Sequence, residues 1–547
     1  MIKKIKNTGL LLIALVLLNV VCHYFYKRFD LTADQRYTLS KTTTNILSKV
    51  DKNLLISVYL EGDFPSEFKR LQSETRQYLE ELAAKNSKIQ ITFKNPDTQR
   101  EALIKRGMMP SQLTVEEDGK LSEAIIFPWA EINYGKKRTL VSLLPAAIVA
   151  SQEAQLQSAI ENLEYSFSNA IHSISQKAQK KIAVLSGNGE LENIYQYSFL
   201  SEVVKKYSLA KFTLDAVATN APKTLEDLLQ LDLVIIAKPT EKFTDKEQFV
   251  LDQFIANGGK TLWMLDNVNA EQDSLSATGK MLVYPRDLNL TNLFFSYGIR
   301  INTTLIKDLY AAQIPVATGQ IGNQPQFKNL EWFYHPLVGG NPNHPITKNN
   351  APVRLQFPNQ IDTLKNNIKK TPLLVSSLLT QKVGTPTFVT LQSIAEEVVE
   401  SDYNSGNQLF AVLLEGKFNS AYKNRIKPFI TPLFKGQSKE NKMIVISDGD
   451  VGKNQLLKDQ PHDLASDKWT NQQFGNKDFL LNAVAYLLDD TGLINLRSKS
   501  LQIRMLDKQK AFKERTFWQF FNVVLPLVML FGFGFGFVHW RKRKYSY

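Results

Sequence analysis

Two long apolar stretches without a formal charge lie near the two ends of the chain, and they constrain its architecture more than any other feature. They occupy residues 8–26 and 517–540 of a 547-residue sequence. Each has roughly the 20 residues that a helix needs to cross the hydrocarbon core of a bilayer. Each also carries aromatic residues near its ends, where membrane helices meet the lipid headgroups. We therefore predict two transmembrane helices that flank a large soluble region.

The first stretch has an alternative interpretation as a cleaved signal peptide, because lysines within residues 3–6 precede it. A signal peptide ends in small residues at its cleavage site, whereas residues 19–21 and 24–26 are bulky or aromatic. A lipoprotein signal needs a small residue directly before Cys22, where Val21 stands. These mismatches favour a retained anchor.

Basic residues indicate how the two helices are oriented. Lysines lie in the N-terminal residues 1–7, and the run from Arg541 to Lys544 lies in the C-terminal tail, residues 541–547. Positive residues favour the cytoplasmic side, so we expect both ends of the chain in the cytoplasm. Basic residues also occur in the stems at 27–49 and 491–516, on the other side of the two spans.

The content of cysteine and charge excludes several classes of site. The sole cysteine, Cys22, lies in the first apolar stretch, so the soluble region can hold no intramolecular disulfide, Cys-based zinc site or Cys nucleophile. The formal net charge of +13 comes partly from the basic clusters beside the membrane. We find no RNP, zinc-finger or basic-helix pattern, and therefore expect no nucleic-acid partner.

The soluble region begins with a small domain at 50–145. Ser40 is expected to cap a short helix in the stem. Strands at 54–60 and 89–94 alternate with helices, and further strands follow over 113–143. This β-α-β-α-β order predicts a thioredoxin-like α/β domain without any CxxC motif. Residues 146–179 are predicted to form a long linking helix.

A second, larger α/β domain is predicted over 180–490. Short apolar runs typical of buried parallel strands alternate with helices, which predicts a doubly wound sheet with a later strand at 442–447. One helix opens with a capping box at Thr244–Glu247 and closes at Gly258-Gly259. Residues 311–440 are rich in Pro, Gly and Asn and are predicted to be an insertion of loops and strands. The apolar strand runs are 181–186, 232–237 and 260–265.

A glycine-containing loop follows the first of these strands and is the candidate ligand site. It comprises Ser186, Gly187, Asn188, Gly189 and Glu190. A loop at the carboxyl end of a parallel strand can bind an anion or another ligand. It can equally be a tight turn with a structural role only, and both interpretations remain open.

No convincing catalytic or cofactor motif occurs in the sequence. The run Gly258–Thr261 lacks the first glycine of a phosphate-binding loop and joins a helix to a strand, the reverse of the required order. Asp266, Asp448 and Asp450 follow strands and could hold a divalent cation, but turn formation is the commoner role. His335 lies in a Pro/Asn-rich segment, where a hydrogen-bonding role is expected. We predict no catalytic residue, metal or cofactor.

The second apolar stretch contains a possible helix-packing motif. Gly532 and Gly536 form a G-x-x-x-G pair within FGFGFGF. Small residues at this spacing let another membrane helix approach closely, although glycine is also common in membrane helices that pack with nothing.

Several passages together resemble one protein family, the gliding-motility-associated ABC transporter auxiliary proteins of Bacteroidetes. The passages are FDLTADQRYTLS (29–40), KIAVLSGNGELEN (181–193), GGKTLWMLD (258–266), MIVISDGDVGKNQ (443–455), LLNAVAYLLDDTGLINLRSKS (480–500) and FWQFFNVVLPL (517–527). The resemblance implies a partner permease and a separate ATP-binding subunit, a role in surface gliding linked to secretion, and an inner-membrane location with most of the chain periplasmic.

The larger domain is also similar to flavodoxin-like folds of the class I glutamine-amidotransferase type, whose catalytic cysteine has no counterpart in this sequence. We therefore expect a non-enzymatic auxiliary subunit of an ABC-type complex. The alternative is a membrane-tethered periplasmic binding protein for a glycan, a peptide or another envelope ligand. An envelope hydrolase with an unrecognised site ranks last.

Overall fold

The computed structural model describes residues 38–62, 66–117, 120–144, 152–176, 179–322, 324–498 and 508–545. The chain divides into two compact units, Met1–Lys499 and Ser500–Tyr547. The predicted first span at 8–26 lies outside the described residues.

The first described element of this unit is the short helix expected after Ser40. Helix α2 spans Lys41–Ser48, and the Ser40 hydroxyl accepts a hydrogen bond from the backbone N–H of Thr43 at 3.0 Å. This contact satisfies one of the free N–H groups at the helix start. Ile46 and Leu47 are buried, as their helical spacing predicts.

A four-stranded mixed sheet follows, with the strand order β2-β1-β5-β6. Strand β1 is parallel to β2 and antiparallel to β5. A hairpin of β3 and β4 forms a separate two-stranded sheet. The α/β class is confirmed here, while the thioredoxin-like assignment stays a prediction. The elements are β1 (Leu54–Val58), α3 (Ser66–Lys85), β2 (Ile89–Phe93), α4 (Arg100–Lys105), β3 (Ser111–Glu117), β4 (Lys120–Ile126), β5 (Trp129–Tyr134) and β6 (Lys137–Ser142).

The expected single linking helix is wrong, because two helices stand there. Helix α5 spans Gln152–Glu161 and α6 spans Leu163–Ser175. The buried residues of α6 share one helical face, which packs on β5 and β6 of the small sheet. The carboxylate of Glu164 on α6 accepts hydrogen bonds from Ser40 N and Thr43 Oγ1, both at 2.8 Å. These helices therefore belong to the small domain rather than merely joining two domains.

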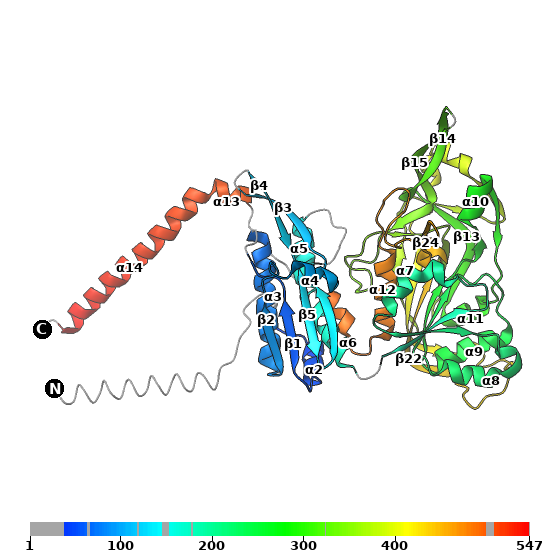
Figure 1. Cartoon of the computed structure of the whole chain (residues 1–547), viewed down its shortest axis with the longest axis horizontal. Coiled ribbons are helices and arrows are strands. Elements are labelled where there is room, and N and C mark those ends of the chain that lie inside the picture. Colours follow the sequence, from blue (N-terminus) through cyan, green and yellow to red (C-terminus); the bar gives the residue numbers. More distant parts are fainter. Residues whose placement is uncertain are drawn as a thin grey trace. The chain divides into compact units, whose positions relative to one another are not determined.

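A seven-stranded sheet forms the larger domain, with the order β18-β21-β22-β10-β9-β7-β8 (Figure 1). Strands β7 to β10 and β22 are parallel, which confirms the strand expected at 442–447. Strands β21 and β18 continue the sheet antiparallel. Residues 311–440, predicted as an insertion of loops and strands, contain both of these antiparallel strands, so a part of the insertion extends the sheet. The bounds are β7 (Lys181–Ser186), β8 (Ser208–Thr213), β9 (Leu233–Ala237), β10 (Lys260–Met264), β18 (Lys369–Val375), β21 (Leu409–Asn419) and β22 (Gln437–Ile446).

Helices cover both faces of this sheet. Successive residues of β7 point to opposite faces: Ile182 packs in the cluster with α7 and α12, and Ala183 in the cluster with α8, α9 and α11. The capping box of α9 is confirmed, since Thr244 and Glu247 bond each other's backbone N–H groups. Burial on both faces explains the continuous apolar runs in the sequence. The helices are α7 (Asn193–Val203), α8 (Val217–Leu228), α9 (Asp245–Ala256), α11 (Thr291–Tyr297) and α12 (Asn476–Leu488).

The remaining strands form small sheets at the carboxyl end of the large one. Trp332, Tyr334 and Phe357 form part of their apolar core. The hairpin of β14 and β15 extends beyond the rest of this domain (Figure 1). The elements are β11 (Val268–Asn269), α10 (Gln272–Thr278), β12 (Lys280–Pro285), β13 (Ile299–Asp308), β14 (Ala311–Ile321), β15 (Gln324–Val338), β16 (Val353–Arg354), β17 (Asn359–Thr363), β19 (Thr380–Val383), β20 (Thr387–Thr390), β23 (Leu456–Leu457) and β24 (Gln460–Pro461), with short 3-10 helices η1 (Leu391–Ala395), η2 (Glu400–Asp402), η3 (Asp450–Gly452) and η4 (Leu493–Ser498).

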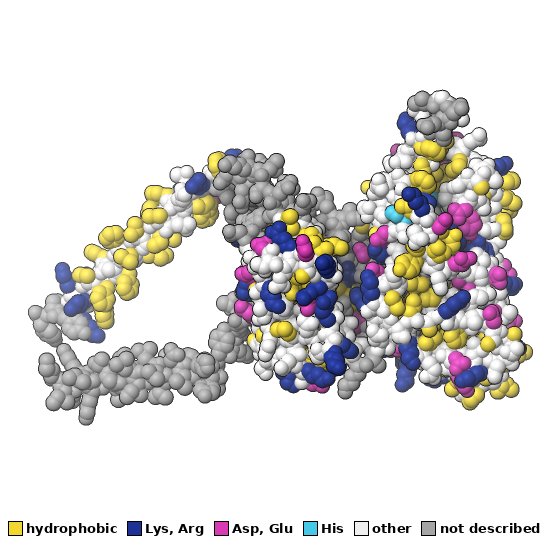
Figure 2. Space-filling model, viewed as in Figure 1, with side chains coloured by type: hydrophobic (Ala, Val, Ile, Leu, Met, Phe, Trp, Pro, Cys, Tyr) yellow, Lys and Arg dark blue, Asp and Glu magenta, His cyan; other side chains and the backbone are white. Residues whose placement is uncertain are grey.

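The second unit contains α13 (Lys508–Lys513) and α14 (Arg515–Tyr545). Within the described residues, one helix is long and apolar enough to cross a membrane; it covers Arg515–Lys544, and its most apolar 18-residue stretch has a mean hydropathy of 2.1. Its apolar side chains lie exposed along the helix (Figure 2). The length and composition agree with the span predicted at 517–540.

Candidate functional site

Three neighbouring parallel strands, β9, β10 and β22, end at the same edge of the large sheet. Lys238, Asp266 and Asp448 follow these strands within two residues, and Asp450 begins η3. The topology therefore gathers residues that are far apart in the sequence. Gly449 permits the close approach, because a Cβ atom there would lie 2.6 Å from the Cγ atom of Lys238.

The ammonium group of Lys238 lies at the centre of this edge. The side chain is 4% exposed, and Nζ lies 2.5 Å from Asp450 Oδ2, 2.8 Å from Glu271 Oε2 and 3.6 Å from Asp266 Oδ2. Burial alone lowers the pKa of the Lys238 amine, but the charges of Asp450, Asp266 and Glu271 outweigh burial and raise the pKa above its usual value. Lys238 is therefore a charged structural centre rather than a neutral nucleophile.

The acidic groups around Lys238 differ in their pKa values. Burial raises the pKa of Asp266 to about 6 and that of Asp448 well above its usual range. Burial also acts on Asp450, but the charges of Lys238 and Lys453 prevail and lower the pKa of that carboxyl. The strongest ion pair at this edge therefore joins Lys238 to Asp450.

The carboxylates at this edge contact backbone N–H groups and the Lys238 ammonium group. Asp266 Oδ1 accepts from the Gly449 N–H at 2.6 Å, and Asp448 Oδ2 accepts from the Gln356 N–H at 2.7 Å. Lys238 Nζ contacts both Asp266 and Asp450. In the part of the chain that the structure describes, no group of three or more His, Cys, Asp or Glu residues could hold a metal ion.

A cavity of about 560 Å³ adjoins the charged cluster. Its wall contains residues that follow the strands of the large sheet and residues of the small sheets at the carboxyl end of that sheet. Lys453 connects the two features: it lines the cavity, and its Nζ atom is 3.8 Å from Asp450 Oδ1. Gln356, held by Asp448, lines the cavity as well. The volume lies within the range of roughly 300–1,000 Å³ that is usual for small-molecule sites.

His335 is the most unusual residue of the cavity wall. It is 2% exposed, and neither of its ring nitrogens has a hydrogen-bond partner among the residues that the structure describes. Burial lowers its pKa to about 3, and the nearby charge of Arg354 acts in the same direction. The expectation of a loop residue with hydrogen bonds is wrong, because His335 lies in strand β15 and has no such partner. Unpaired buried polar groups are costly, so a water molecule or a ligand is expected to bond this ring.

The loop expected to bind a ligand, Ser186–Glu190, lies elsewhere and has internal partners. The carbonyl oxygen of Asn188 accepts hydrogen bonds from Thr240 N and Glu241 N, both at 3.0 Å. A Cβ atom on Gly189 would lie 2.0 Å from Thr240 Oγ1, so only glycine fits against this neighbouring loop. None of the five loop residues lines the 560 Å³ cavity. These contacts give the loop a packing role, and ligand binding by it remains only a prediction.

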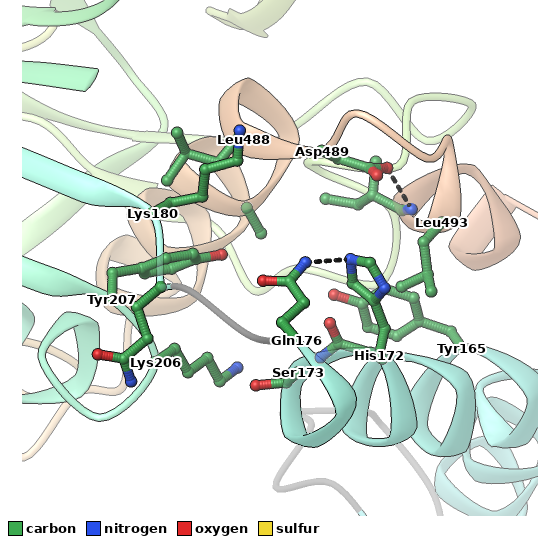
Figure 3. A pocket seen from close by; sticks show the side chains of 14 residues that line it. Tyr165, His172, Ser173, Gln176, Lys180, Lys206, Tyr207, Leu488, Asp489 and Leu493 are labelled. Atoms are coloured by element: carbon green, nitrogen blue, oxygen red, sulfur yellow. Dashed lines mark hydrogen bonds between the residues drawn. The ribbon is translucent and has the colours of Figure 1, made fainter. Parts of the chain in front are cut away.

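A second, much smaller cavity of about 70 Å³ lies between α6 and the larger domain (Figure 3). Tyr165 and His172 of α6 face Lys206, Tyr207 and Asp489 across it. This volume suits a few water molecules and is too small for a metabolite.

The sequence reasoning missed Lys238, and it named His335 without placing it at this edge of the sheet. Lys238 directly follows an apolar strand run, so a search for charged residues at strand ends could have found it. No sequence signal brings His335 to the same place, because its strand belongs to the inserted small sheets.

Comparison with known proteins gives two family matches. A family model described as an ABC-type uncharacterized transport system matches residues 179–483, and a domain of unknown function matches residues 33–133. The matches fall on the larger and the smaller α/β domain respectively.

Individual relatives are distant. The chain is similar to an uncharacterized protein of Borreliella burgdorferi (strain ATCC 35210 / DSM 4680 / CIP 102532 / B31), with 22% identity over 428 residues, 76% of this chain and 78% of the relative. Among solved structures, the mmIFT52 N-terminal domain matches with 14% identity and a TM-score of 0.32, covering 57% of this chain and 99% of that domain.

Proposed function

This chain belongs to the family of ABC-type uncharacterized transport systems, and on that premise we propose that it is a membrane-anchored, non-enzymatic subunit that works with a permease and a separate ATP-binding subunit. The chain is an auxiliary component of an ABC-type transport system. The observation that carries the proposal is the family match over residues 179–483, in a chain whose second unit is an exposed apolar helix.

The non-enzymatic role is supported by the edge of the large sheet, where a site would be expected. Lys238 and Asp450 neutralise each other there. His335, the histidine in the cavity wall, has no hydroxyl or carboxylate of the described ranges hydrogen-bonded to its ring. Within the described residues, this edge therefore presents neither a nucleophile activated by a base nor a metal-activated water. Ser186→Ala and Asp448→Asn should each leave function intact in cells that accumulate the protein normally.

We further propose, from the resemblance carried by residues 29–40 and 443–455, that the complex serves gliding motility. Membrane association is supported by the apolar helix α14 and by the transporter family. An inner-membrane location with the α/β domains in the periplasm follows from the predicted orientation of the two spans.

Purification from native membranes tests this proposal. A tag after Tyr547 should recover an ABC permease and an ATP-binding subunit, identified by mass spectrometry, and deletion of the gene should abolish surface spreading. The matched control is an equally abundant tagged membrane protein from the same cells. Recovery of the chain without any ABC subunit would overturn the role as an auxiliary subunit.

The alternative role, a tethered binding protein, is favoured by one specific observation. The cavity of about 560 Å³ has a buried histidine without hydrogen-bond partners in its wall. An auxiliary subunit can also bind a ligand, so the two roles are compatible.

A further inference from the structure

The 560 Å³ cavity carries an inference about ligand chemistry that goes beyond the proposed role as a subunit. His335 provides the first constraint. With its pKa near 3, the ring is neutral at physiological pH and therefore presents one N–H donor and one nitrogen acceptor. Neither nitrogen has a hydrogen-bond partner in the described part of the chain. A hydroxyl group can donate to one such atom and accept from another, so a polyhydroxylated ligand matches this wall.

The charges of the wall provide the second constraint, because most of them are already paired. Arg354 lies 2.8 Å from Asp467, with both side chains largely buried. Lys453 lies 3.4 Å from Asp273 and 3.8 Å from Asp450. A charged ligand would have to compete with these pairs, whereas a neutral polar ligand leaves them in place.

Aromatic side chains provide the third constraint. Trp469 lines the cavity and is 64% exposed, and Phe327 lines it with 63% exposure. Tyr195 also belongs to the wall. Aromatic rings pack well against the C–H faces of a sugar ring, while the hydroxyl groups at its edge reach polar atoms.

We propose that this cavity is a binding site for a neutral saccharide, in which Trp469 packs against a sugar ring and His335 hydrogen-bonds a hydroxyl group. The site lies at the carboxyl edge of the large sheet but is displaced from the loop at 186–190, whose own contacts close that part of the edge. A peptide shares the hydrogen-bonding capacity of a saccharide but not the apolar ring face, so we favour the saccharide.

The test uses the full chain, purified in a detergent without a sugar headgroup, because a maltoside or glucoside would compete. Isothermal titration calorimetry measures chitotriose, maltotriose, cellotriose and mannotriose in one arm. Dialanine and inorganic phosphate form the other arms. We expect saturable binding of at least one of the four neutral saccharides and none of the other probes.

Two variants locate the site. Trp469→Ala should weaken saccharide binding by roughly tenfold or more, as is common when a contacting tryptophan is truncated. Phe295→Ala, a similarly exposed aromatic residue at 60% exposure on α11, is the matched control and should bind as the parent does. His335→Phe keeps a ring but removes both nitrogens, and should weaken binding as well. If the buried His335 variant does not fold, the exposed Trp469 variant still shows whether the cavity is the saccharide-binding site.

The proposal is overturned if none of the four saccharides binds, if only dialanine or phosphate binds, or if Trp469→Ala binds as tightly as the parent. Co-purification of the permease with Trp469→Ala is measured in parallel. Loss of saccharide binding with the permease retained confirms two separate roles. Saccharide binding without any ABC subunit would contradict the proposed function alone.

Discussion

Lys238 Nζ lies 2.5 Å from Asp450 Oδ2, although the two residues are 212 positions apart in the sequence. This ion pair joins the end of β9 to the turn that follows β22, across the intervening strand β10. It holds together the edge of the sheet that supports the cavity wall.

Replacing Lys238 with methionine should destabilise the protein strongly. The variant keeps the length of the side chain but removes the cation that lies closest to Asp450, Asp266 and Glu271. The more distant Lys453 and Arg286 remain, at 3.8 Å from Asp450 and at 3.2 Å from Glu271 and 4.0 Å from Asp266. Removing one partner from a buried ion pair commonly costs about 3–5 kcal/mol. Urea unfolding of the full chain in detergent, followed by tryptophan fluorescence, measures this loss.

Lys242→Met is the matched control for that experiment. Lys242 forms an ion pair with Asp287 at 2.6 Å, but both side chains are more than half exposed. Such pairs contribute up to about 1 kcal/mol. Equal effects of the two substitutions would contradict a structural role for the buried cluster.

The stability of the protein should fall as the pH rises from about 4 to about 6, through the contribution of Asp266. Burial raises the pKa of this carboxyl to about 6 in the folded protein, whereas an unfolded aspartate titrates near 3.9. Between these values the folded state holds a proton that the unfolded state has lost, so raising the pH favours unfolding.

The Asp266→Asn variant removes this titration and should reduce the slope of the unfolding free energy with pH in that window. A part of the slope remains, because burial also raises the pKa of Asp448. Asp287→Asn is the control: the hydrogen bond from Lys242 lowers the pKa of Asp287, so its titration lies below the window. An unchanged slope in the Asp266 variant would show that another group is responsible.

The predicted topology can be measured by labelling single cysteines. With Cys22 replaced by serine, Lys120→Cys in β4 should react with a membrane-impermeant maleimide in intact cells, while Tyr547→Cys should react only after lysis. The reason is that basic residues at both ends of the chain favour the cytoplasmic side. Protection of position 120 in intact cells would reverse the orientation.

The double substitution Gly532→Leu and Gly536→Leu should weaken association with the permease without impairing membrane insertion. A Cβ atom on either glycine meets nothing within 4 Å, so leucine does not disturb the helix itself. Leucine is at least as favourable as glycine in hydrocarbon, but its bulk keeps a neighbouring helix at a distance. Co-purification should fall for the double variant and not for Val528→Leu. Equal recovery of the permease would place the contact elsewhere.

The sequence predicted the parts of the fold whose signals are local. The buried strands β7, β9, β10 and β22 appear as apolar runs, and the capping box at Thr244 marks the start of α9. Strand β8 was missed because it lies at the sheet edge, where its alternating, half-exposed residues give a weak pattern. Strands β18 and β21 were assigned to an insertion, because pairing between segments that are distant in the sequence produces no local sequence pattern.

The candidate site was less predictable than the fold. The loop at 186–190 has the glycines of a ligand loop, yet its carbonyl groups bond the neighbouring loop. The cavity depends on how strands β14 and β15 lie over the sheet edge, which is a property of tertiary packing. The loop at 186–190, Asp266 and Asp448 all follow parallel strands and so pointed to the correct edge, but none of them pointed to the cavity itself.

The pairing of β10 with β22 also constrains how the polypeptide can acquire its structure. Asn441 at β22 donates to the carbonyl of Gly259 beside β10, 182 positions earlier. During synthesis, the side of β10 that pairs with β22 therefore stays unpaired until most of the chain has been made. An apolar strand edge that is open for so long is prone to aggregation. We expect the newly made chain to depend on a chaperone until residue 446 has emerged. A proteolytic cut between β10 and β22 before the two strands have paired should prevent the sheet from forming.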